Sequence, residues 1–229
     1  MKSQLLIPAA GMGVRLGQDR PKALLDVAGK PMLIRALERF VPLGLLEGVL
    51  IVIPPSHRPD FERVLKKAFA GAEFTLIDGG AERQESVHRG LDRLDPGTEV
   101  VVIHDAARPF VAAESVQMSM SAAEECGAAT VAIPCVDTIL EAGKDQYLVN
   151  TPDRAALWAC QTPQTFRTEV IREAHAAAKR DQAILTDDAS LVRRVGGMVR
   201  LVRGTALNFK ITTPADLVLA ECVVRNALA

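Results

Sequence analysis

The sequence predicts an α/β protein whose mostly parallel sheet is covered by helices on both faces. Two observations lead to this fold class. Short apolar runs alternate with amphipathic stretches along most of the chain, which is typical of parallel strands joined by crossover helices. Three of the runs also end in polar or glycine-rich segments, at residues 7–11, 77–80 and 103–109. Because ligands of such sheets bind beyond the carboxyl ends of the strands, these segments predict one shared site.

The predicted elements follow from hydrophobic periodicity. The predicted strands are 4–9, 48–54, 74–78, 99–105, 129–134 and 198–203. The predicted helices are 31–43, 58–69, 82–94, 112–126, 168–180, 187–196 and 213–228. In the second helix, Phe61, Leu65 and Phe69 recur at helical spacing. The last helix begins at a cap residue, Thr213.

Residues 135–154 interrupt this alternation. Two triplets, TIL (138–140) and YLV (147–149), flank a Gly-Lys pair, which predicts a β-hairpin with no crossover helix after it. An excursion of this length is usually functional or an interaction arm. The chain shows no internal repeat and no clear linker, so we expect one domain over residues 1–229, with the arm at about 135–154.

Composition limits the classes of partner. The 229 residues carry 27 Lys and Arg against 28 Asp and Glu, a net charge of −1, which argues against nucleic acid or an anionic membrane as the main partner. Residues 1–30 hold five cations and two anions, so we expect a small anionic ligand there. The four cysteines include no C-x-x-C pair, and no uncharged run is long enough for a membrane span. We expect a cytoplasmic protein with reduced thiols.

The basic segment at residues 10–22 is a candidate phosphate-binding loop. It fails the dinucleotide fingerprint because Leu16 stands at the third glycine position, and it fails the P-loop pattern because Ala23 follows Lys22. Its glycines still allow backbone N–H groups to approach a phosphate closely, and Arg15 and Lys22 supply positive charge. A flexible surface loop with solvated cations remains the alternative.

Seven motifs appear together and in order, at residues 8–22, 78–87, 104–109, 151–158, 161–164, 186–190 and 208–217. Together they resemble the 2-C-methyl-D-erythritol 4-phosphate cytidylyltransferases of the non-mevalonate isoprenoid pathway. The resemblance implies a Rossmann-like, three-layer nucleotidyltransferase domain whose protruding β-arm embraces a second subunit. It implies transfer of CMP from CTP to a sugar-alcohol phosphate, with release of pyrophosphate, by a homodimer that uses Mg²⁺. Since the sequence stops at residue 229, we expect a monofunctional enzyme.

The resemblance also implies roles for individual residues. Arg15 and Lys22 would contact the triphosphate, and Arg154 and Lys210 the substrate phosphate; these four are the predicted catalytic residues. Further substrate contacts would be Arg108, Thr138, Thr162 and Thr186. The nucleotide would be bound by Pro8, Ala9, Ala10, Gly11, Gly13, Gly80, Arg83, Ser86, Asp105 and Ala106. No residue is predicted as a metal ligand, although Asp105 could touch the ion through water.

The chemistry suits these residues because a phosphate monoester is mostly anionic at neutral pH, with a second pKa near ~6. The nucleophile therefore needs no general base, and catalysis has to come from positioning and positive charge. Another polyol phosphate, such as ribitol 5-phosphate, is an alternative substrate. An NAD-type oxidoreductase is disfavoured by Leu16, and a non-catalytic nucleotide sensor stays open.

Several of these residues also have simpler interpretations. Asp105 could cap a turn, and Arg154 could form a turn salt bridge. Lys210 could be a solvated strand-end residue, and Thr186 could be a helix N-cap. His104 is expected to be structural.

Overall fold

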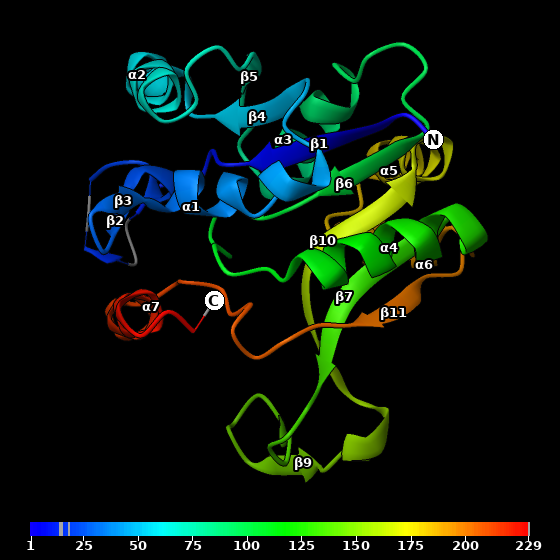
Figure 1. The fold of residues 1–229 in the computed structure, drawn as a ribbon. Coiled ribbons are helices and arrows are strands. Elements are labelled where there is room, and N and C mark those ends of the chain that lie inside the picture. Colours follow the sequence, from blue (N-terminus) through cyan, green and yellow to red (C-terminus); the bar gives the residue numbers. More distant parts are fainter. Residues whose placement is uncertain (14–15, 18, 229) are drawn as a thin grey trace.

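The fold is built around a seven-stranded sheet (Figure 1). The computed structural model describes residues 1–13, 16–17 and 19–228. In spatial order the strands are β11 (Arg200–Arg203), β7 (Ala128–Pro134), β10 (Trp158–Arg167), β6 (Val100–Ile103), β1 (Ser3–Pro8), β4 (Val49–Ile53) and β5 (Phe74–Asp78). The six predicted strands are all present, with ends shifted by at most two residues.

The sheet is mostly parallel, as the sequence predicts. β1 pairs in parallel with β4 and β6, β4 with β5, and β7 with β11. The exception is β10, which runs antiparallel to both of its neighbours, β6 and β7. This strand is absent from the predicted set, because its buried part, residues 161–166, consists largely of polar residues.

Helices cover both faces of the sheet. One face packs against α1 (Met32–Glu38), α2 (Arg58–Ala68) and α4 (Ala113–Cys126), and the other against α3 (Arg83–Leu91), α5 (Thr168–Arg180) and α6 (Asp188–Arg194). Side chains of β1 alternate between the two layers, since Leu5 and Ile7 join the first and Leu6 joins the second. The three-layer arrangement is therefore confirmed.

The last helix, α7 (Pro214–Arg225), packs in a smaller apolar cluster with Val27, Phe110 and Ile211. Its start is fixed by the predicted cap, because the Thr213 side chain accepts from the N–H of Asp216 in a capping box. A short ribbon, β2 (Asp26–Val27) with β3 (Lys30–Pro31), leads into α1. The short 3-10 helices are η2 (Lys22–Leu24), η3 (Val41–Leu43), η4 (Pro55–His57) and η5 (Arg154–Ala156). Within the described residues, no helix has both the length and the apolar character to cross a membrane.

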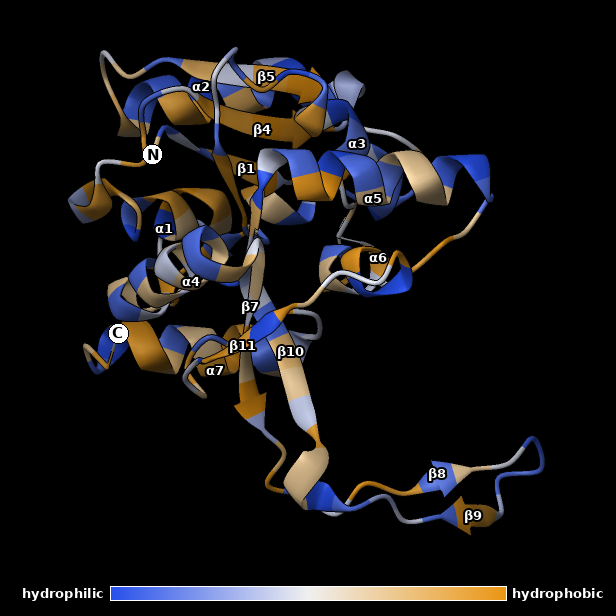
Figure 2. Cartoon of the chain, turned by 90° about the vertical axis from the view of Figure 1, so that its right-hand side faces the viewer, coloured by the Kyte–Doolittle hydropathy of each residue, from blue (hydrophilic) through white to orange (hydrophobic). Residues whose placement is uncertain are grey.

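The arm leaves the body between β7 and β10 and ends in a small antiparallel hairpin (Figure 2). Its strands are β8 (Glu141–Ala142) and β9 (Leu148–Asn150), and the turn is closed by Gly143 N–H donating to the Tyr147 carbonyl at 2.9 Å. Apolar side chains on the arm are exposed, with 81% of Val136 and 66% of Val149 accessible to solvent. The predicted hairpin is present, and its apolar surface is not covered by the body of the chain.

Candidate active site

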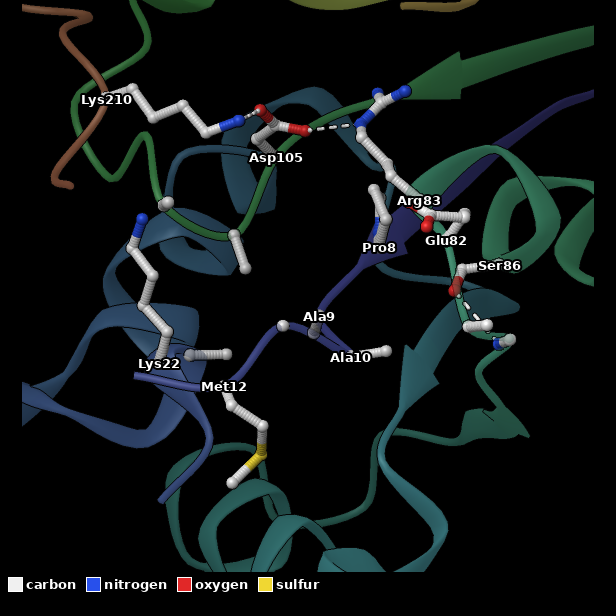
Figure 3. A pocket seen from close by; sticks show the side chains of 16 residues that line it. Pro8, Ala9, Ala10, Met12, Lys22, Glu82, Arg83, Ser86, Asp105 and Lys210 are labelled. Carbon is white, nitrogen blue, oxygen red and sulfur yellow. Dashed lines mark hydrogen bonds and ion pairs between the residues drawn. The ribbon is translucent and has the colours of Figure 1, made fainter. Parts of the chain in front are cut away.

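A cavity of about 310 Å³ lies where the carboxyl ends of β1, β5 and β6 meet (Figure 3). It is lined by Pro8, Ala9, Ala10, Gly11, Met12, Lys22, Ala23, Gly80, Ala81, Glu82, Arg83, Ser86, Asp105, Ala106, Ala107 and Lys210. β1 lies between β4 and β6, and ligands of open α/β sheets bind where the strand order reverses in this way. The three strand ends singled out in the sequence thus form one site.

The loop after β1 folds back so that its two ends lie side by side. Lys22 N–H donates to the Gly11 carbonyl at 3.0 Å, and Gly13 N–H donates to the Arg20 carbonyl at 2.9 Å. Lys22 and Lys210 lie on one side of the cavity, and Ser86 lies opposite them (Figure 3). Gly13 is buried outside the cavity lining. Arg15 lies outside the described residues.

The loop after β5 closely approaches the loop after β1. A Cβ atom on Gly79 would lie 2.5 Å from the Cβ of Ala10 and 3.3 Å from the Ile53 carbonyl oxygen. Gly79 N–H donates to that carbonyl at 2.8 Å, and Gly80 N–H donates to the Ser86 hydroxyl at 3.1 Å. Glycine at position 79 is therefore required for the two loops to form one wall of the cavity.

Asp105 is the centre of an ionic network. Its carboxylate accepts from Lys210 Nζ at 2.7 Å and lies 3.4 Å from Arg83 Nε. Arg83 Nη1 in turn contacts Asp188 in α6 at 2.8 Å, and Asp188 contacts His175 Nε2 at 3.1 Å. Burial opposes ionisation of Asp105, but the nearby cations, Arg83 first, outweigh it and hold its pKa well below the usual range.

The backbone of Asp105 is held through two buried side chains. Asp105 N–H donates to the Thr162 hydroxyl at 3.1 Å, and that hydroxyl lies 3.1 Å from His104 Nδ1. Burial lowers the pKa of His104 to about 4, so the ring is neutral at pH 7. Its Nε2–H donates to the Arg108 carbonyl at 2.9 Å, which leaves Nδ1 to accept from Thr162. The expectation of a structural His104 is consistent with this position.

Arg108 lies just outside the cavity lining and braces neighbouring segments. It donates to the carbonyl of Asn208 at 2.8 Å and to that of Cys160 at 3.1 Å. Thr162 is buried beneath Asp105. The structure therefore groups these two predicted substrate residues beside the cavity, and their contact with substrate stays a prediction.

Thr138, Arg154 and Thr186 do not line this cavity. Thr138 is exposed on the arm, and Arg154 at the arm's base donates to the Val136 carbonyl at 2.8 Å rather than forming the alternative turn salt bridge. Thr186 is exposed before α6, and the N-cap alternative for it is wrong, because the cap is Asp187, which accepts from Ser190 N–H at 2.9 Å. The roles assigned to all three stay predictions.

The simpler interpretations of two other residues also differ from the observed contacts. Lys210 is paired with Asp105 rather than only solvated. The Asp105 side chain is engaged by Lys210 and Arg83 rather than capping a turn.

Sequence reasoning missed Gln164, which positions Asp188. The side-chain oxygen of Gln164, Oε1, accepts from the backbone N–H groups of Asp188 at 3.0 Å and Ala189 at 3.1 Å. Its side-chain nitrogen, Nε2, donates to the Asp187 carboxylate at 2.9 Å. Gln164 thereby fixes the start of α6, which carries the carboxylate that meets Arg83. The motif at residues 161–164 was the only signal for it.

A divalent cation in this cavity would have few protein oxygens to bind it. Within the described part of the chain, no group of three or more His, Cys, Asp or Glu side chains is placed to hold a metal. Asp105 and Glu82 line the cavity, and Mg²⁺ bound to a triphosphate needs only one or two carboxylates. The residues therefore fit an ion that is held mainly by its nucleotide.

Comparison with known proteins places the chain in a family. Residues 4–226 match the family model described as 2-C-methyl-D-erythritol 4-phosphate cytidylyltransferase. A protein of that name from Geobacter metallireducens is 42% identical over 228 residues, covering 97% of each chain, and one from Caldanaerobacter subterraneus is 40% identical over 227 residues, covering 99% of this chain and all of the relative. The crystal structure of the Thermus thermophilus enzyme superposes with a TM-score of 0.82 at 39% identity, covering 98% of this chain and 100% of that one. The chain therefore belongs to the 2-C-methyl-D-erythritol 4-phosphate cytidylyltransferase family.

Proposed function

We propose that the chain transfers CMP from CTP to 2-C-methyl-D-erythritol 4-phosphate, giving 4-diphosphocytidyl-2-C-methyl-D-erythritol and pyrophosphate. Membership of the family supports this activity. The observation that carries it is the cavity itself, in which a glycine-rich loop with Lys22 faces the Asp105–Lys210 ion pair. Such a site offers backbone N–H groups and cations to phosphate oxygens, and the described residues that line it include no His or Cys.

The proposed mechanism is an in-line attack of the substrate phosphate on the α-phosphorus of CTP. Lys22, together with Arg15, stabilises the charge that grows on the triphosphate, and Lys210, together with Arg154, aligns the attacking phosphate. Asp105 keeps Lys210 at the cavity through the 2.7 Å ion pair. When bound with the nucleotide, Mg²⁺ supplies further charge neutralisation between phosphate oxygens.

The nucleotide is proposed to lie along the wall formed by the loops after β1 and β5. Ser86 and the backbone at Gly80 would contact the base, and Asp105 and Ala106 would contact the ribose. The positions of these residues around one cavity support the assignment. Rejection of other bases would then depend on buried polar groups that a wrong base leaves unpaired.

We further infer a homodimer formed through the arm, in which Thr138 and Arg154 act at the partner's site. The exposed apolar side chains of the arm support this inference, as does the position of Arg154 outside the cavity lining of its own chain. We also propose that residues 1–229 form one nucleotidyltransferase domain, and that the enzyme acts in the cytoplasm.

The test is product identification by mass spectrometry. The protein is incubated with CTP, Mg²⁺ and an equimolar mixture of 2-C-methyl-D-erythritol 4-phosphate and ribitol 5-phosphate. We expect pyrophosphate release and the cytidyl product of the first phosphate, with kcat/KM clearly above that for ribitol 5-phosphate. Preferential formation of the ribitol product would contradict the assigned substrate, and CTP binding without turnover would indicate a nucleotide sensor.

A further inference from the structure

The loop after β5 is held from behind by two side chains of α3, Glu85 and Arg89, which we call the loop clamp. The Glu85 carboxylate accepts from Ala81 N–H at 2.8 Å, and its other oxygen accepts from Arg89 Nη2 at 2.6 Å. Arg89 Nη1 also donates to the backbone carbonyls of Gly79 at 2.8 Å and Asp78 at 3.2 Å. Charge-assisted hydrogen bonds therefore tie three backbone groups of residues 78–81 to one helix.

The loop clamp does not face the nucleotide cavity. Gly80, Ala81 and Ser86 line that cavity, whereas Glu85 and Arg89 line a separate hollow between α3 and α5. The clamp residues are therefore placed to influence a bound nucleotide through the loop rather than by direct contact.

Little space is left for the loop to move toward the clamp. A Cβ atom on Gly80 would collide with the Glu85 side chain, so the backbone at residue 80 lies directly on that side chain. On the other side of the loop, Gly79 packs closely against Ala10. The N–H of Ala81 holds the pKa of Glu85 below its usual value, with Arg89 adding to the effect, so the carboxylate is ionised at neutral pH.

We propose that the loop clamp sets the base specificity of the cavity by fixing the orientation of the peptide groups at residues 79–81. The inference rests on the proposed function, because it takes the β5 loop to be the surface that meets the base. Cytosine and uracil differ in the hydrogen-bonding groups on one ring edge. Discrimination between them requires donors and acceptors that cannot turn to suit the wrong base. Glu85 and Arg89 are positioning residues in this scheme and do not contact the nucleotide.

The test compares binding of CTP and UTP to Glu85→Ala by calorimetry, without polyol phosphate. We expect the ratio of Kd for UTP to Kd for CTP to fall by about 10-fold. This is the size of effect expected for the loss of one charged hydrogen bond that orients the loop. In kinetics, KM for CTP rises, while kcat at saturating CTP and KM for the polyol phosphate stay within about twofold of wild type. Glu85→Gln, which keeps an oxygen acceptor for Ala81 N–H, retains most of the discrimination.

The matched control is Glu221→Ala, which removes an ion pair of the same i,i+4 spacing from α7, where Arg225 Nη2 lies 2.9 Å from Glu221. It leaves both Kd values unchanged. Hydrogen exchange at residues 79–81 gives a second readout, and it becomes faster in Glu85→Ala but not in Glu221→Ala.

Where the wild type prefers CTP, an unchanged ratio of Kd for UTP to Kd for CTP in Glu85→Ala would overturn the inference. Equal weakening of CTP and UTP binding, with unchanged hydrogen exchange at residues 79–81, would overturn it as well. A wild type that binds neither nucleotide better than the other would instead contradict the proposed function.

Discussion

The strand-end cavity and the arm both carry cations of the proposed site, but they hold them differently. At the strand ends, Lys210 contacts Asp105, which also contacts Arg83, and Arg83 reaches Asp188 on α6. At the base of the arm, the Arg154 side chain is exposed and donates to one backbone carbonyl, that of Val136. The strand-end network joins side chains from four separate parts of the fold. Arg154, in contrast, is held by a carbonyl of the arm itself. The strand-end cations are thus preorganised within one chain. If the arm serves the partner's site, as proposed, Arg154 would reach its working position only in the dimer.

The largest effect is expected in the strand-end region. Lys22→Ala should lower kcat by about 10²–10³-fold, because it removes positive charge that stabilises the transition state. Lys66→Ala, on the exposed side of α2, is the control and should leave kcat unchanged. Steady-state kinetics with varied CTP measure the effect, and a change confined to KM would contradict a catalytic role for Lys22.

A smaller effect is expected for Asp105→Asn, which keeps the shape of the side chain and removes its charge. Because Lys210 and Arg83 lose their shared partner, kcat/KM should fall by about 10–100-fold. The pKa of Asp105 is lowered in the folded state, so its contribution to stability is fully present above the unfolded pKa and is lost as the pH falls through the folded value. Urea unfolding should therefore show the stability gap between wild type and variant narrowing from about pH 5 downward. A gap that widens in acid would contradict the assigned ion pair.

For the arm, we expect a change in KM for the polyol phosphate and a specific activity that depends on protein concentration. Arg154→Ala should raise KM for the polyol phosphate about 10-fold and leave CTP affinity unchanged, since it removes one charged contact to a phosphate. Lys144→Ala, in the turn of the same arm, is the control. Wild-type specific activity should also fall on dilution if the arm supplies the partner's site.

Mixing Lys22→Ala with Arg154→Ala sharpens the comparison. In a mixed dimer, one site receives an intact strand-end cavity from one chain and an intact arm from the other. At polyol phosphate concentrations well below KM, the activity of the mixture should therefore exceed that of either variant alone. The absence of any recovery, with mixed dimers shown by native mass spectrometry, would place Arg154 at its own chain's cavity.

The smallest effect on catalysis is expected at His104. Burial lowers its pKa to about 4, below the unfolded value near ~6.5, so it favours the folded state above pH 6.5 and this stabilisation is lost as the pH falls toward 4. His104→Gln should reduce that acid sensitivity by about 1–3 kcal/mol in urea unfolding between pH 7 and about pH 4. His57→Gln, near the protein surface, is the control. If the free energy of unfolding depended on pH with the same slope in wild type and in His104→Gln, His104 would not be held neutral in the folded protein.

The sequence predicted the elements that depend on hydrophobic patterning, and it missed those that depend on long-range pairing. β4 and β6 consist entirely of buried apolar residues, so their type followed from composition. β10 buries Gln161, Thr162 and Gln164, and their polar groups are satisfied by side chains and backbone groups far away in sequence. The same limit applies to the site, because the strand-end loops were recognisable but the contact of Arg83 with Asp188, 105 residues apart, was not.

The arm is inserted between two strands that already lie next to each other in the sheet. Cys135 N–H donates to the Leu157 carbonyl at 3.0 Å, and Trp158 pairs with Pro134, so the chain returns to the point from which it left. The intervening segment can thus be excised and its ends joined by a tight reverse turn without breaking the ladder below. We expect such a shortened chain to keep the strand-end cavity and to lose the proposed contact with a partner, which would separate nucleotide binding from turnover.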